Sequence, residues 1–153
     1  MGVQVKHFQE LGVTLNIYSG PITREVLLRR IEEMRADIDR WVTYFDPSAT
    51  GLVDVSSVPE VRGAFKAKIK ELYGERRIRC AMVADPGTQD MLLRFWPTYF
   101  VADGQNTTPS GAFTSLENVG AFTSLESASD WLNLPEGASK VLTDAVESFR
   151  AGG

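Results

Sequence analysis

Hydrophobic and polar residues alternate in two short segments near the start of the chain. Residues 3–8 read Val-Gln-Val-Lys-His-Phe, and in residues 13–18 apolar side chains recur at every second position. A period of two is typical of a strand with one buried face. Because a glycine-containing turn separates the two segments, we expect an antiparallel hairpin.

The pattern becomes helical after Thr23. Apolar residues recur at alternating spacings of four and three, at Leu27, Ile31, Met34, Ile38, Trp41 and Phe45. This spacing predicts one face of a single long helix, with charged residues such as Arg29 and Arg30 on its other faces. Thr23 is expected to cap the helix, and Asp46-Pro47 is expected to end it.

Strands and helices then alternate along the chain. A short apolar run at residues 51–55 predicts a buried strand, and a helical stripe across residues 59–73 predicts the next helix. Residues 78–84 have the composition of another buried strand. A turn at residues 85–88 leads into a third predicted helix, which Pro97 ends or bends.

A seven-residue sequence, Gly-Ala-Phe-Thr-Ser-Leu-Glu, occurs twice, at residues 111–117 and 120–126. We expect the second copy to supply a strand over residues 119–122. The pair Thr123 and Glu126 matches a capping box, which predicts the start of another helix. The first copy is expected to lengthen the polar loop that precedes the strand.

The expected order of elements is β-β-α-β-α-β-α-β-α-α, with the last helix over residues 138–149. Alternation of strands and helices indicates an α/β fold. We expect a mostly parallel sheet of about five strands with an N-terminal antiparallel hairpin, alternating helices and a C-terminal helical extension. Residues 1–153 are expected to form a single domain, with a core over about residues 3–134 and a C-terminal helix over residues 135–150.

Composition narrows the classes of function. The 16 basic and 20 acidic residues give a net charge of −4, which does not favour binding to nucleic acid or anionic membranes. A single cysteine, Cys80, and a single histidine, His7, exclude an intrachain disulfide and a multi-thiolate or His-rich metal centre. Cys80 is expected to be an inert core thiol, and His7 a surface residue of an edge strand. We expect a cytoplasmic protein with no transmembrane segment and no cofactor.

Four stretches of the chain resemble the bacterial STAS-like domains, which are related to anti-sigma-factor antagonists and share a fold with the lipid-binding SEC14 group. The stretches are residues 17–28 (IYSGPITREVLL), 51–58 (GLVDVSSV), 77–85 (RIRCAMVAD) and 119–132 (VGAFTSLESASDWL). The resemblance spans about residues 13–134, and it implies a binding or signalling module.

In partner-switching antagonists of this family, a serine within an Asp-Ser-x-Gly pattern is phosphorylated. The corresponding stretch here, residues 58–63, reads Val-Pro-Glu-Val-Arg-Gly and has no hydroxyl. The resemblance therefore implies a module that lacks the usual phosphoserine switch.

The first candidate interaction or ligand site comprises Asp54, Ser56 and Ser57. Asp54 lies in an apolar strand, and strand ends in such sheets bind ligands. The simpler interpretation, which we favour, is that its carboxylate accepts backbone N–H groups of the following loop. The two serines are candidates for phosphorylation or anion binding, but the interpretation that we favour is that they cap the next helix.

The second candidate site is a dense apolar and aromatic stretch at residues 91–100. It contains Met91, Phe95, Trp96, Tyr99 and Phe100. One interpretation is a lid or wall over a hydrophobic ligand; the other is core together with a dimer surface.

The first functional hypothesis is a non-enzymatic regulatory or protein-interaction module that acts on a protein partner or on itself as a homodimer. The alternative is a carrier or sensor that binds a lipid or other apolar small molecule in a SEC14-like pocket. An enzyme is the weakest hypothesis, because His7 is the only histidine and no nucleophile or nucleotide-binding motif occurs. We assign no catalytic residue.

Overall fold

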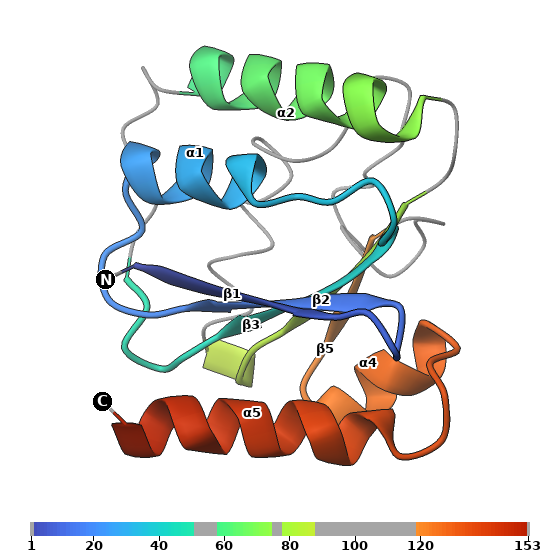
Figure 1. The fold of residues 1–153 in the computed structure, drawn as a ribbon. Coiled ribbons are helices and arrows are strands. Elements are labelled where there is room, and N and C mark those ends of the chain that lie inside the picture. The colour runs from blue at the N-terminus through green and yellow to red at the C-terminus, as the bar shows by residue number, and fades with distance from the viewer. Residues whose placement is uncertain (1, 51–57, 75–77, 88–118, 153) are drawn as a thin grey trace.

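The computed structural model describes residues 2–50, 58–74, 78–87 and 119–152. Helices and strands are layered in an α/β arrangement (Figure 1). The elements are β1 (Val3–Phe8), β2 (Val13–Tyr18), α1 (Arg24–Glu32), β3 (Arg40–Phe45), α2 (Val58–Tyr73), β4 (Arg79–Val83), β5 (Val119–Phe122), α4 (Leu125–Trp131) and α5 (Ala138–Gly152).

The strands of the described residues form one sheet in the order β1-β2-β3-β4-β5. β1 pairs antiparallel with β2, and every later pair of neighbours is parallel. Parallel neighbours need a crossover, which α1 supplies between β2 and β3 and α2 supplies between β3 and β4. The predicted α/β class and the N-terminal antiparallel hairpin are confirmed.

Helices cover both faces of the sheet (Figure 1). α1 and α2 lie on one face, and α4 and α5 lie on the other. The two-residue period divides β2 between these layers, because Tyr18 packs with α1 and α2 whereas Leu15 and Ile17 pack with α4 and α5. Cover on both faces explains why every residue of β2 is buried.

The prediction of one helix from Leu27 to Phe45 is wrong. α1 ends at Glu32, and residues 40–45 form β3. All the apolar residues of the predicted stripe are nevertheless buried in one cluster, at Leu27, Ile31, Met34, Ile38, Trp41 and Phe45. Residues 41–45 are mostly aromatic or β-branched, and pairing with both β2 and β4 makes them a strand.

Three other predicted elements are confirmed, and three predictions cannot be compared with the described residues. The predicted helix over residues 59–73 and the predicted strands over 78–84 and 119–122 are confirmed as α2, β4 and β5. The predicted strand over 51–55, the third helix before Pro97 and the first copy of the repeat lie outside the described residues.

The predicted cap of α1 is confirmed, and the predicted cap of α4 is wrong. Thr23 caps α1 as predicted, since its Oγ1 accepts from the N–H of Val26 at 3.2 Å. Ser124, not Thr123, caps α4 by accepting from the N–H of Ser127 at 3.1 Å. The N-cap of α4 therefore lies one residue after the position that the capping box predicted.

Candidate functional site

Both candidate sites named from the sequence lie outside the described residues. They are Asp54, Ser56 and Ser57 in the first site, and Met91, Phe95, Trp96, Tyr99 and Phe100 in the second. Their roles therefore stay predictions. The described residues contain a different pocket, which no sequence pattern singled out.

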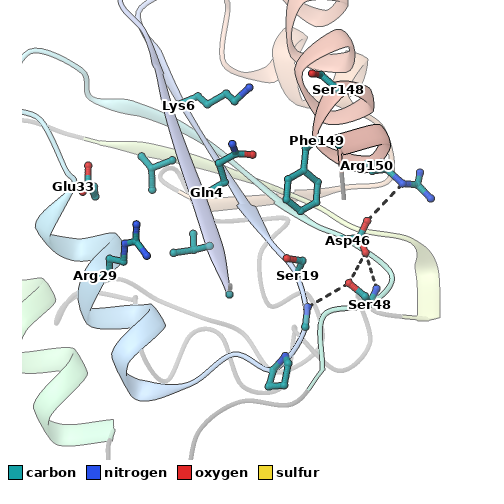
Figure 2. A pocket seen from close by; sticks show the side chains of 16 residues that line it. Gln4, Lys6, Ser19, Arg29, Glu33, Asp46, Ser48, Ser148, Phe149 and Arg150 are labelled. Carbon is teal, nitrogen blue, oxygen red and sulfur yellow. Dashed lines mark hydrogen bonds and ion pairs between the residues drawn. The ribbon is translucent and has the colours of Figure 1, made fainter.

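This pocket, named here the β1 pocket, lies along the outer edge of β1 and reaches the carboxyl ends of β2 and β3 (Figure 2). Its volume of about 990 Å³ is at the upper end of the range typical of ligand clefts. The residues that line it are Gly2, Val3, Gln4, Val5, Lys6, Ser19, Gly20, Pro21, Arg29, Glu33, Asp46, Ser48, Ser148, Phe149, Arg150 and Gly152.

β1 is an edge strand of the described sheet, so one side of its backbone faces this pocket. The N–H of Ser19 donates to the carbonyl of Gly2 at 3.0 Å, which marks these two residues as a hydrogen-bonded pair. Such pairs alternate with non-hydrogen-bonded pairs along an antiparallel ladder. The backbone N–H and C=O groups of Val3 and Val5 therefore form no hydrogen bonds with β2. Their N–H and C=O groups point away from β2, toward the pocket.

Two helices flank this strand edge from opposite faces of the sheet (Figure 2). Arg29 comes from α1 and Glu33 from its C-cap, whereas Ser148, Phe149 and Arg150 come from α5. Neighbouring strands lie about 4.8 Å apart, but packed helices need about 8–10 Å. An edge flanked by helices therefore favours a single extended segment over a second folded domain.

The loops that follow β2 and β3 form one end of the pocket and are bonded to each other. The N–H of Thr50 donates to the carbonyl of Gly20 at 2.9 Å, and the N–H of Ile22 donates to the carbonyl of Thr50 at 3.1 Å. The N–H of Gly20 also donates to Ser48 Oγ at 3.3 Å. This joined pair of loops stands at the carboxyl ends of parallel strands, where open α/β sheets bind ligands.

Asp46 organises this end of the pocket. Its Oδ2 accepts hydrogen bonds from the backbone N–H of Ser48 at 2.9 Å and from Ser48 Oγ at 2.5 Å. Its Oδ1 lies 3.6 Å from Nε of Arg150, in the last turn of α5. The Asp46 side chain is 15% exposed and that of Arg150 is 56% exposed, so the carboxylate is held while the guanidinium still meets solvent.

Tyr44 lies beside these charges. Burial raises the pKa of its phenol, Arg150 opposes that rise, and the carboxylates of Asp46 and Asp85 reinforce it. The Tyr44 hydroxyl therefore stays protonated at neutral pH.

The β1 pocket contains two cations from different elements. Lys6 stands on β1 and Arg29 on α1. Within the part of the chain that the structure describes, neither of them forms an ion pair, whereas Arg150 pairs with Asp46.

A third arginine of the same region has a different role. Arg30 is only 3% exposed, although the sequence placed it on an outer helix face. Its guanidinium carbon lies 4.6 Å from the centre of the Trp41 ring and 5.9 Å from that of Phe65. Nη1 also donates to Sδ of Met34 at 3.6 Å. Arg30 therefore belongs to the packing between α1 and the sheet.

The thiol of Cys80 and the imidazole of His7 do not line the pocket. Cys80 is buried, and burial raises the pKa of its thiol, which confirms the expected core position. His7 lies on the edge strand β1, as expected, but its ring is only partly exposed, and Nδ1 lies 2.9 Å from Oγ1 of Thr14. Burial and, after it, the charge of Arg35 lower the pKa of His7.

The sequence contains partial signals for the β1 pocket. The turn-forming residues 19–21 and 46–48 mark both of its loops. The helical period over residues 27–45 conceals, however, that Asp46 directly follows a parallel strand. The edge position of β1 depends on the order of strands in space, which no local pattern encodes.

Comparisons with protein-family models, with curated proteins and with solved structures found no match. Across the described ranges, no helix is long and apolar enough to cross a membrane. The same residues include no group of three or more His, Cys, Asp or Glu side chains arranged to hold a metal ion. The resemblance to STAS-like domains stays a prediction from the sequence.

Proposed function

We propose that this chain is a non-enzymatic protein-interaction module, which binds an extended segment of a partner protein as an added strand beside β1. The observation that carries the proposal is the β1 pocket, toward which the backbone groups of Val3 and Val5 point. In complexes formed by strand addition, main-chain hydrogen bonds supply affinity and pockets for alternate side chains supply specificity.

The lining of the β1 pocket favours a peptide over a lipid. Lys6, Arg29, Glu33 and Ser148 present charged or hydroxyl groups, which an apolar ligand would leave without hydrogen-bond partners. The ring of Phe149 offers an apolar surface to a side chain of the added strand. A strand with mixed polar and apolar side chains matches this combination.

The absence of a catalytic role is part of the proposal. Among the described residues, the thiol of Cys80 is buried, and the imidazole of His7 contacts Thr14. Neither residue lines the β1 pocket. The serine, lysine and carboxylate side chains that do line it can form the hydrogen bonds and ion pairs that recognition of a peptide needs.

The resemblance to STAS-like domains supports a regulatory version of the same role, because those domains act through protein contacts. We include in the proposal that this module works without the usual phosphoserine switch, since residues 58–63 have no hydroxyl. The carrier hypothesis depends on residues 91–100, which lie outside the described residues, and it stays a prediction.

A proline substitution on β1 tests strand addition directly. Val5→Pro removes an N–H that points toward the pocket without removing a bond between β1 and β2, and proline is tolerated on edge strands in this position. Peptides selected from a random library on the wild-type protein should bind Val5→Pro about ten-fold more weakly or worse. The matched control, Val5→Thr, keeps both the N–H and the β-branched shape and should bind as the wild type does.

The proposal is wrong if Val5→Pro, shown to be folded by its thermal transition, binds the selected peptides as tightly as the wild type. A library that yields no binding peptide would contradict it as well.

A further inference from the structure

We infer that the strand added to β1 is acidic and carries carboxylates on both of its faces. This inference rests on the proposed strand addition and names the chemistry of the partner segment. It follows from the positions of Lys6 and Arg29, which approach the edge of β1 from opposite faces of the sheet.

Lys6 provides the cation on the α5 face. Val3 and Val5 pack in the cluster beneath α1, so the alternation of side chains places Gln4 and Lys6 on the other face of β1. Figure 2 shows Lys6 lining the pocket on the same side as the residues of α5. A carboxylate of the added strand on this face would meet an ammonium that no described carboxylate engages.

Arg29 provides the cation on the α1 face. It is exposed, in contrast to the neighbouring Arg30, which is buried against Trp41. Its planar guanidinium suits a carboxylate better than an ammonium does, because it can donate two parallel hydrogen bonds. The α1 face therefore offers a second, independent attraction for an acidic side chain.

The acidic residues of the pocket oppose this attraction only locally. The carboxylate of Asp46 is bonded to Ser48 and paired with Arg150. The other acidic residue of the lining, Glu33, lies near His7, and its carboxylate acts to raise the pKa of that histidine. An acidic side chain of the partner is therefore disfavoured near that end of β1.

The two-residue period of a strand turns this arrangement into a spacing rule. Side chains an odd number of positions apart point to opposite faces, and those an even number apart share a face. A carboxylate for Lys6 and one for Arg29 must therefore be separated by an odd number of positions. Two acidic side chains at an even spacing lie on the same face of the strand, so they can pair with only one of the two cations.

The test is the selection of peptides from a random library on the wild-type protein, on Lys6→Gln and on Arg29→Gln. The matched control is Lys70→Gln, which removes an exposed charge from α2 and lies outside the pocket lining. Affinities of the selected peptides are measured by fluorescence anisotropy at low and high salt. Protection of the Val5 amide from hydrogen exchange reports whether each peptide adds to β1.

We expect acidic peptides with oddly spaced carboxylates, whose affinity falls about three-fold for each cation removed and roughly ten-fold for both. Their affinity should also fall with added salt, and Lys70→Gln should leave it unchanged. Peptides that protect the Val5 amide but are neutral, or that bind Lys6→Gln and Arg29→Gln unchanged, would overturn this inference and leave strand addition standing. If no peptide protects that amide, or if the chain itself dimerises through β1, both proposals fail.

Discussion

Arg150 and Asp46 join the last turn of the C-terminal helix to the loop after β3, with Nε and Oδ1 3.6 Å apart. The same carboxylate accepts two hydrogen bonds from Ser48, and Ser48 in turn accepts one from Gly20. One aspartate therefore connects α5 and the two loops that close the β1 pocket. This connection has a measurable consequence for stability.

Replacing Asp46 should lower the free energy of unfolding more than replacing Arg150 does. Asp46→Ala removes both bonds to Ser48 and leaves its N–H without that partner, so we expect a loss of about 1–2 kcal/mol in the free energy of unfolding. Arg150→Gln removes only an ion pair whose cation is 56% exposed, so the loss should be below about 1 kcal/mol. Urea unfolding of both variants measures the difference, and equal losses would contradict the central role of Asp46.

Two consecutive arginines should differ sharply in their contribution to stability. Arg30 is 3% exposed and lies over the Trp41 ring, so Arg30→Ala should lower the free energy of unfolding by about 2–4 kcal/mol. Arg29 is exposed, and Arg29→Ala should change it by no more than about 0.5 kcal/mol. Chemical unfolding followed by tryptophan fluorescence compares the two variants. Similar stabilities of the two variants would show that the Arg30 side chain does not pack between α1 and the sheet.

The cap of α4 distinguishes the structure from the sequence pattern. The Ser124 side chain accepts from the N–H of Ser127 at 3.1 Å, so Ser124→Ala should lower the free energy of unfolding by about 1 kcal/mol. Thr123→Ala should have a smaller effect, because Thr123 is exposed and precedes the cap. Thermal unfolding of the two variants decides between these assignments; the reverse order of effects would restore the predicted capping box.

His7 should make the protein less stable as the solution becomes mildly acidic. Burial lowers the pKa of His7 in the folded state, so below its unfolded pKa the unfolded chain binds the proton more readily than the folded one. Stability from this residue is therefore present above pH 6.5, the ordinary value, and is lost as the pH falls toward the folded pKa.

Unfolding at pH 7 and pH 5 of the wild type and of His7→Gln tests this dependence. The wild type should lose more stability between the two values than the variant does. Identical losses would mean that the environment of His7 does not favour its neutral form.

Local patterns in the sequence predict much of the fold because they reflect burial. Leu27 and Trp41 are both expected in one buried stripe, and both are buried in the same cluster. The pattern could not show that the helix ends between these two residues, because helical and extended segments can bury their apolar residues against the same layer. Pairing of β3 with β2 and β4, which is a tertiary interaction, decides the outcome.

The β1 pocket could not be predicted in the same way. Lys6 and Arg150 are unremarkable in the sequence, and they line one pocket only because an edge strand and the last helix meet there. The edge position of β1 follows from the strand order, and the outward direction of the Val5 backbone follows from the register with β2. Both are properties of the assembled sheet.

The most direct test of strand addition is amide hydrogen exchange at Val3 and Val5, measured by NMR with and without a peptide selected on the wild-type protein. Both amides point away from β2, so in the free protein they should exchange faster than those of Gln4 and Lys6, which bond to β2. Bound peptide should slow exchange at Val3 and Val5 while leaving Gln4 and Lys6 nearly unchanged. Peptide binding without new protection at Val3 and Val5 would contradict the account.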